Sequence, residues 1–392
     1  MTVTVYFALV PRDGLFCKDG RGWHTSASGR GHALDWPWPS TVLGAVRTAW
    51  GREEESRRGS SFRPDEWREW TATIRLGRTL ALRRPHGQAW AAEHRIWPVP
   101  ADALWLEGED RVHRLDPVPG DIPTLGRDDD EAREALWWPR LGGREKPLRA
   151  ARWWNEGDSC AWLAGHPVLA CNQPDILAPP RRIQVQVGIR VAELTADEGV
   201  LFSHDVLETL EQEAEWAIAV EADVPSSAPL QLATLGSDSR LAQIEEMSSE
   251  MFNPPASLLK TFRQGSKGLR LVVVTPACFR RGWLPDGFEQ RGREYRGHLP
   301  DVDGEVVLRA AFVPRPVHVS GWDMAANGGE GAPKPTLRLV KPGAIYFFER
   351  ADGRPFGEAD ARSLWLAAIG DRRAEGFGRV APGGWSPRRS NT

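Results

Sequence analysis

Two stretches at opposite ends of the 392-residue chain carry its strongest structural signals: WPWPSTVLGAVRTAWG, residues 36–51, and RRAEGFGRVAPGG, residues 372–384. The first predicts a proline-set turn, an N-cap at Ser40 and a short helix that carries Arg47 and ends at Gly51. The second predicts a glycine-rich loop between a helix and the final strand. Such loops let backbone N–H groups approach phosphate closely.

The glycine-rich loop has a specific chemical logic in its central sequence, Gly376-Phe377-Gly378-Arg379. Two glycines separated by one residue reach backbone angles closed to other residues, so successive N–H groups can point into one concavity that holds an anion. Arg373 and Arg379 would add phosphate contacts, while Phe377 would either stack on a base or anchor the loop in the core. The alternative is a tight helix-to-strand turn without a ligand.

Apolar periodicity places the regular elements and suggests two halves. Alternating residues predict strands at 2–10, 183–191, 215–224, 268–274, 305–313 and 344–348, and a helical pattern covers 358–369. The sequence APPRR at 178–182 resembles a domain junction. The strand that follows it is similar in position and type to the first strand. We therefore expect an α+β fold in two domains, 1–180 and 181–392, that repeat one architecture.

The formal net charge is only −3, which argues against a protein whose whole surface attracts nucleic acid. Any nucleic-acid contact must be local. Three basic clusters are candidates, each of which is alternatively a solvated face: Arg140, Arg144, Lys146, Arg149 and Arg152; Arg280, Arg281, Arg291, Arg293 and Arg296; and Arg372, Arg373 and Arg379. The 19 tryptophans, against 3 tyrosines, are candidate stacking platforms or subunit anchors, although core packing is the alternative for each.

Metal and membrane signals are absent from the sequence. The four cysteines show no CxxC spacing, and the acidic run at 128–131 is contiguous, so its carboxylates cannot all converge on one ion. No apolar run approaches the ~20 residues that span a bilayer, and the N-terminal segment alternates unlike a signal peptide. We expect a cytoplasmic protein without metal or cofactor.

Four segments together resemble a known family. The two stretches quoted first, with VVTPACFRRGWLPDG at 273–287 and VSGWDMAANGGEGAPKPTLRLVKPGAIYFFE at 319–349, are similar to the repeat-associated mysterious proteins (RAMPs) of CRISPR systems. Their order resembles the third subunit of the type III-B (Cmr) effector complex. The resemblance implies two ferredoxin-like (RRM-like, βαββαβ) RAMP modules with long inserted loops.

The same resemblance implies a non-catalytic subunit of an antiviral ribonucleoprotein. It would bind the 5′ handle of crRNA and join the large polymerase-like subunit to the backbone RAMP subunit, meeting target RNA only indirectly. One alternative is the equivalent subunit of a type III-A (Csm) complex. Another is a metal-independent endoribonuclease that cuts CRISPR repeat RNA, for which His24 and His32 are the candidate catalytic residues because they precede the first helix.

The RAMP pattern also implies which residues face RNA. The helix and the loop before it point to Arg30, Ser40 and Arg47, although Arg47 is alternatively a satisfied surface arginine. Lys334 lies between two prolines on a stiff segment, and Trp322 either stacks or hydrogen-bonds locally. The full set of candidates is Arg30, Ser40, Arg47, Trp322, Lys334, Arg373, Gly376, Phe377, Gly378 and Arg379.

Overall fold

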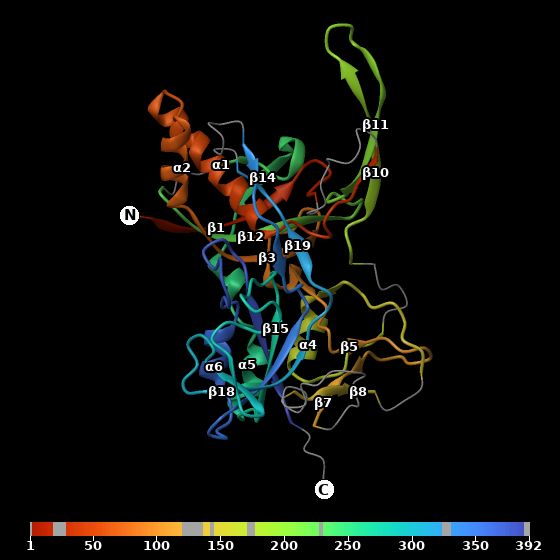
Figure 1. Cartoon of the computed structure of the whole chain (residues 1–392), viewed down its shortest axis with the longest axis vertical. Coiled ribbons are helices and arrows are strands. Elements are labelled where there is room, and N and C mark those ends of the chain that lie inside the picture. Colours follow the sequence, from red (N-terminus) through yellow and green to blue (C-terminus); the bar gives the residue numbers. More distant parts are fainter. Residues whose placement is uncertain are drawn as a thin grey trace.

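The computed structural model describes residues 2–18, 29–119, 136–141, 145–170, 177–226, 230–323 and 331–387. Short helices pack around mainly antiparallel sheets, which confirms the α+β fold class (Figure 1). None of the helices within these ranges is long and apolar enough to cross a membrane.

The first large sheet has seven strands, and all its neighbouring pairs are antiparallel. In spatial order they are β13 (Leu232–Thr234), β14 (Leu241–Glu246), β1 (Val3–Pro11), β12 (Ala214–Val224), β3 (Arg75–Pro85), β4 (Arg95–Pro98) and β9 (Trp153–Asn155). The first strand therefore pairs with segments near residues 220 and 245. The domain boundary expected at residue 180 falls between strands of one hydrogen-bonded sheet.

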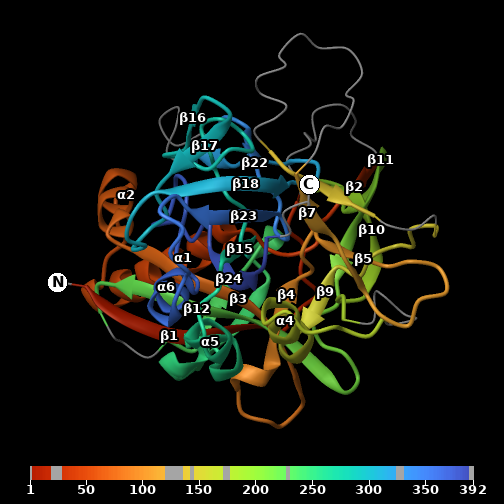
Figure 2. The same ribbon diagram turned by 90° about the horizontal axis from the view of Figure 1, so that it is seen from below.

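The second large sheet is built from the C-terminal part of the chain. Its antiparallel order is β16 (Glu289–Arg291), β17 (Glu294–Gly297), β18 (Val306–Phe312), β23 (Ile345–Arg350), β15 (Gly268–Val273) and β24 (Val380–Trp385). In Figure 2, β18, β23 and β15 run side by side. The strand predicted at 215–224 is thus confirmed in the first sheet. Those predicted at 268–274, 305–313 and 344–348 are confirmed in the second.

The strand predicted at 183–191 forms, but in a different setting from the one expected. It is β10 (Arg181–Arg190), which pairs with β11 (Thr195–Leu207) in a hairpin that projects from the body, and β2 (Gly29–Gly31) runs parallel to β11 (Figure 1). Its alternating apolar side chains are about half exposed instead of buried. The strand therefore does not open a second copy of the first sheet, because no described element covers its apolar face.

The first helix is longer than predicted. Helix α1 (Pro39–Arg58) begins with Pro39 after the N-cap residue Trp38, and no side-chain cap forms, so the predicted N-cap at Ser40 is wrong. Gly51 therefore lies inside the helix and does not end it. Trp67 of α2 (Pro64–Ala72) packs against this glycine, and a Cβ there would stand 2.4 Å from the Trp67 ring. The helix ends at Gly59 in a left-handed cap.

The last helix is shorter than predicted. Helix α6 (Glu358–Leu364) ends at Trp365, and Leu366 has a φ of 57°. The next residues pair with the approach to β24, since the Leu366 N–H donates to the Val380 carbonyl and the Ile369 N–H donates to the Gly378 carbonyl. This pairing competes with the helical hydrogen bonds and terminates the helix early.

The remaining elements are short. Between the strands lie helices α4 (Glu156–Leu163) and α5 (Ala256–Arg263) and 3-10 turns at Ala92–His94, Ser237–Ser239 and Ser249–Phe252. Four two-stranded ribbons complete the fold: β5 (Ala103–Leu104) with β6 (His113–Arg114), β7 (Asp116–Val118) with β8 (Trp138–Arg140), β19 (Val317–Val319) with β22 (Leu337–Leu339), and β20 (Trp322–Asp323) with β21 (Ala332–Pro333).

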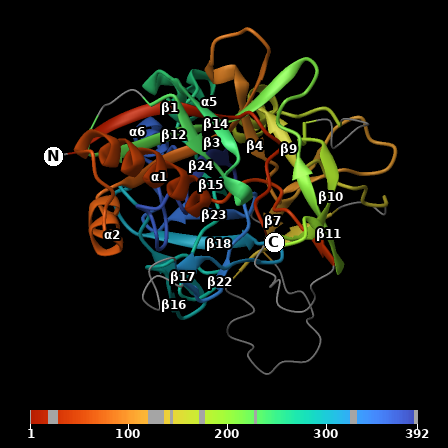
Figure 3. The same cartoon turned by 90° about the horizontal axis from the view of Figure 1, so that it is seen from above.

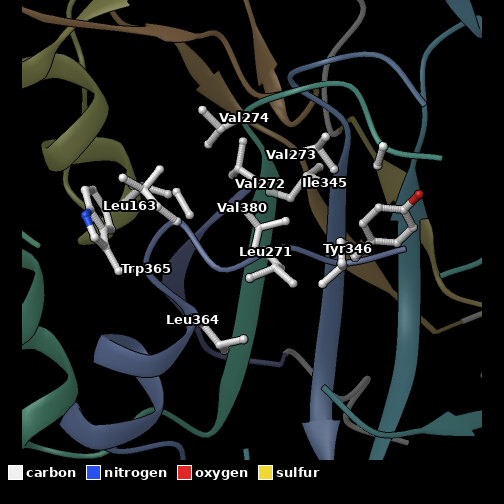
Figure 4. Close-up of a cluster of buried hydrophobic side chains, with 14 of the residues drawn as sticks. Leu163, Leu271, Val272, Val273, Val274, Ile345, Tyr346, Leu364, Trp365 and Val380 are labelled. Atoms are coloured by element: carbon white, nitrogen blue, oxygen red, sulfur yellow. The ribbon is translucent and has the colours of Figure 1, made fainter. Parts of the chain in front are cut away.

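The two large sheets share one core. One face of the first sheet contributes Ala8, Leu82 and Ala219 to the same buried cluster as Leu271 and Phe347 of the second sheet. The other face of the first sheet is covered by α1, which lies across its strands in Figure 3. Figure 4 shows the centre of the shared core, where β15, β23 and β24 meet side chains from α4 and the end of α6.

Most described tryptophans serve this packing and not the surface. The buried ones are Trp38, Trp50, Trp97, Trp105, Trp154, Trp162, Trp216, Trp365 and Trp385. Core packing, the alternative to surface stacking, therefore applies to these positions.

A buried ion pair fastens the 99–170 region to the second sheet. Asp102 and Arg270 are 0% and 1% exposed, and their charged groups lie 3.1 Å apart. Arg270 also donates to the carbonyls of Trp162 and Leu163, while the Trp162 indole N–H donates to Asp102. Removing one partner of such a pair leaves an uncompensated buried charge.

We predict that Asp102→Asn lowers the free energy of unfolding by about 3–5 kcal/mol, because Arg270 then loses its only described carboxylate partner. Urea denaturation of the purified chain measures this loss. The control is Asp303→Asn, which breaks an exposed pair with Arg354 and is expected to cost less than about 1 kcal/mol. Equal losses for the two variants would contradict the assignment of Asp102 as a structural fastening.

Candidate functional site

The glycine-rich loop connects α6 to β24 and touches the first sheet. Gly376 and Gly378 have φ values of 87° and 73°, which confirms that both need left-handed backbone. A Cβ on Gly376 would lie 2.8 Å from Leu76 of β3 and 3.2 Å from Pro39 of α1. The loop is therefore a point of close contact between the C-terminal strand region and the first sheet with its helix.

The N–H groups of this loop are used inside the protein. Gly376 donates to the Arg373 carbonyl, Gly378 donates to the Pro276 carbonyl at 2.9 Å, and Arg379 donates to the Thr275 hydroxyl at 2.9 Å. These three groups therefore do not form the anion-holding concavity that the glycine spacing predicted. These N–H groups instead stabilise a helix-to-strand turn through hydrogen bonds inside the protein.

The side chains of Phe377 and Arg379 also point into the protein, whereas Arg373 is exposed. Phe377 is fully buried against Trp38 and Leu339, so it anchors the loop in the core. The Arg379 guanidinium donates to the carbonyls of Leu366 and Arg373, and burial lowers its pKa to about 10, so it stays protonated at neutral pH. Arg373 donates to the Gly370 carbonyl at 2.7 Å.

Arg47 is half-buried on α1 beside the same loop. Its guanidinium donates to the Ile74 carbonyl, and burial lowers its pKa while the nearby Glu375 opposes that shift. Ser40 lies in the first turn of the same helix and is partly exposed. The structure thus brings Ser40, Arg47 and the glycine-rich loop into one region, although the arginine is engaged internally.

The other sequence candidates are scattered. His24 lies outside the described residues. The backbones of Arg30 and Trp322 pair with Ser203 and Pro333, and their side chains lie outside the described part of the structure.

His32 and Lys334 are exposed. The ring of His32 lies 3.6 Å from the Asp205 carboxylate. Lys334 lies at the end of β21, and its backbone N–H donates to the Gly321 carbonyl at 2.7 Å.

The basic clusters differ in how far they are paired with acidic side chains. At least three of the five arginines at 280–296 are paired, whereas in the first cluster Arg152 is paired and, within the described residues, Arg140 and Lys146 form no ion pair. Arg152 pairs with Asp35, Arg280 with Asp371, Arg291 with Glu305, and Arg296 with Glu294. In the third cluster, Arg372 pairs with Glu375. Arg144 lies outside the described residues. This pairing matches the solvated-face alternative for these arginines.

A set of basic residues, of which the sequence analysis had singled out only Lys334, lies beside the glycine-rich loop. In the β19–β22 ribbon, Val317, Val319, Leu337 and Leu339 pack toward Trp38 and Phe377, while His318 and Arg338 pair across the ribbon and are exposed. Arg315, Lys334 and Lys341 flank it and are also exposed. We call His318, Arg338, Arg315, Lys334 and Lys341 the cationic ribbon.

The basic side chains of the cationic ribbon have no acidic partners among the described residues. Within the described residues, none of its five side chains forms an ion pair or hydrogen bond. The alternation Val317-His318-Val319 and Leu337-Arg338-Leu339 is the sequence signal that predicts this surface, because period-two residues place His318 and Arg338 on one face. Unpaired basic side chains of this kind are available for phosphate groups.

A cavity of about 380 Å³ opens beside the cationic ribbon, between the first large sheet and segments that flank strands of the second. Its walls include Trp36, Trp38 and Trp153, together with the 274–276 segment under the glycine-rich loop. Lys341 belongs both to its lining and to the cationic ribbon. The ring centroids of Trp36 and Trp153 lie 5.8 Å apart in an edge-to-face arrangement. Cavity and ribbon therefore form one continuous surface.

The chain matches known proteins at the level of family and of solved structure. The model of the family described as CRISPR-associated protein (Cas_Cmr3) matches residues 7–385. A cryo-EM structure of "the Type III-B Cmr-beta bound to cognate target RNA and AMPPnP, state 1" is similar with a TM-score of 0.45 and 10% identity, covering 87% of this chain and 86% of that chain. A second, "the Type III-B Cmr-beta bound to cognate target RNA", is similar with a TM-score of 0.43, the same identity and the same coverage.

No curated protein matches the chain. The family match extends over both large sheets and includes all four segments on which the sequence resemblance rested, so it confirms that resemblance. The chain therefore belongs to the Cas_Cmr3 family of CRISPR-associated proteins.

Proposed function

We propose that this chain is a non-catalytic subunit of a type III-B effector complex and that it binds the 5′ handle of crRNA across the cationic ribbon. The observation that carries the RNA assignment is the set of unpaired basic side chains on a ribbon beside an aromatic cavity. Single-stranded RNA is bound by a few cations together with aromatic surfaces, which suits a chain with a net charge of −3. The glycine-rich loop supports this surface from beneath.

We further propose that each large sheet is a ferredoxin-like RAMP module. Both contain antiparallel strands in the spatial order 4-1-3-2, as β14-β1-β12-β3 and as β24-β15-β23-β18. The first has α1 at the first helix position, and the second has α6 at the second helix position. This interpretation places the module boundary between β14 and β15 instead of at residue 180.

The proposed bridging role needs a surface for other subunits, and the β10–β11 hairpin supplies one. Ile183, Val185, Val187 and Leu201 lie on one face and are between 43% and 62% exposed. The arginines of the hairpin are paired with acidic residues: Arg181 with Asp35, Arg182 with Glu208 and Arg190 with Glu193. An apolar face without free cations fits the apolar strand face of a partner protein, such as the backbone RAMP subunit, and not RNA.

We expect the double variant Val185→Asp/Val187→Asp to keep the melting temperature of the isolated chain, because both side chains are exposed, and to fail to join the assembled complex. Co-purification with the other subunits measures incorporation. Gln186→Asp, on the opposite face of the same strand, is the matched control and should incorporate normally. Normal incorporation of the double variant would remove the hairpin face from the interface.

Two arginine variants test the RNA surface, one at the exposed Arg338 of the ribbon and one at Arg379, which is hydrogen-bonded inside the protein. Arg338→Ala should weaken binding of handle RNA about tenfold or more, because it removes one charge-assisted contact of about 1.5–3 kcal/mol. It should also reduce the slope of log affinity against log salt by about 0.7, with an unchanged melting temperature. Fluorescence anisotropy of the assembled complex at several salt concentrations measures both quantities.

Arg379→Ala should behave in the opposite way. Its guanidinium satisfies the carbonyls of Leu366 and Arg373, so its loss should lower the free energy of unfolding by about 1–3 kcal/mol. Arg354→Ala, at an exposed arginine paired with Asp352, controls for a general loss of charge. If Arg379→Ala weakens RNA binding while Arg338→Ala does not, the site belongs to the glycine-rich loop and not to the ribbon.

The non-catalytic assignment has its own test. In the described residues, no group of three or more His, Cys, Asp or Glu side chains is arranged to hold a metal ion. We expect no specific cleavage when the purified chain is incubated with CRISPR repeat RNA in EDTA. Cleavage that is lost in His24→Ala or His32→Ala would establish the endoribonuclease alternative instead.

A further inference from the structure

The cavity beside the cationic ribbon is lined by residues that suit a flat aromatic group. Its walls are mostly apolar, with the indole rings of Trp36, Trp38 and Trp153 among them, and its volume of about 380 Å³ lies in the range of small-ligand pockets. Among the residues that the structure describes, the indole N–H of Trp38 has no hydrogen-bond partner. A ligand with both a planar ring and acceptor atoms would match these walls.

Charge is arranged at one side of the cavity. Lys341 lines the cavity and belongs to the cationic ribbon, while Val317 of the wall is the neighbour of the exposed His318. Asp35 and Arg152, which also line the cavity, are paired with each other at 2.9 Å. The unpaired positive charge therefore lies on the ribbon side, where an anionic group attached to the bound ring would extend.

An aromatic ring linked to phosphates is the chemistry of a nucleotide. We propose that the cavity takes one unstacked base of single-stranded RNA and that the phosphates flanking this base lie on the cationic ribbon. This inference rests on the proposed RNA-binding function and adds the position at which a single base is held. The walls combine strands of the first large sheet with segments that flank strands of the second, such as 274–276 and 341–343, so the base would contact both parts of the chain at once.

The test uses two changes, a protein variant that fills the cavity and guide RNAs that each lack one base. Ala150 is an exposed residue of the cavity lining, so Ala150→Trp adds a bulky ring at the cavity without disturbing the core. Ala359→Trp, on the exposed side of α6, is the matched control. Both variants are assembled into the full complex with guide RNAs that carry one abasic nucleotide at successive handle positions, and the dissociation constant is measured for each pair.

We expect Ala150→Trp to weaken binding of intact RNA about tenfold, whereas Ala359→Trp has no effect. One abasic position should weaken wild-type binding by a similar factor and should have no further effect in Ala150→Trp, because the two changes remove the same contact. A 2-aminopurine base at that position should lose fluorescence in the wild-type complex through stacking on tryptophan.

Three results would overturn the inference while leaving the RNA-binding function intact: unchanged affinity of Ala150→Trp, no sensitive abasic position, or additive effects of filling and base removal. If handle RNA does not bind the wild-type complex through this subunit, and Arg338→Ala changes nothing, the proposed function itself fails.

Discussion

The close approach of the glycine-rich loop to the first sheet is the constraint on which the arrangement of the two sheets depends. The Leu76 N–H donates to the Ala374 carbonyl at 2.8 Å, and Gly376 lies against Leu76 and Pro39 where no side chain fits. This contact sets the distance between β3 and the strand that follows the loop. The shared core, the cavity and the position of α1 relative to the second sheet all follow from that distance.

A small buried cluster connects the glycine-rich loop to the ribbon at the surface. Phe377 projects from the loop beneath Trp38, and Leu339 of the ribbon covers both. The ribbon therefore has a fixed apolar underside, which orients His318 and Arg338 outward. In the proposed RNA site the loop would therefore give rigid support from inside the protein, while the side chains that meet solvent belong to another segment of the chain.

The regular elements were predictable where local patterns decide them, and the site was not. Strands such as 215–224 alternate strongly and formed as predicted, whereas the end of α6 depends on pairing with residues beyond the loop, which no local pattern reveals. The glycine spacing correctly predicted left-handed backbone. It did not predict that the N–H groups of the loop donate to Thr275 and Pro276, because these two residues reach the loop only through tertiary contact. The acidic partners of Arg280 and Arg291 were likewise not predictable from the local sequence, since they come from other segments.

The pairing of β1 has a consequence for how the protein is made on the ribosome. Thr4 and Asp223 are hydrogen-bonded although they lie 219 residues apart in the chain. At ordinary rates of translation, β1 therefore waits about 10–40 s before its neighbour β12 has been synthesised. During that interval an apolar strand has both edges open, so nascent chains need protection from premature association. The order of synthesis thus places a kinetic risk on β1, which is made long before its neighbours in the sheet.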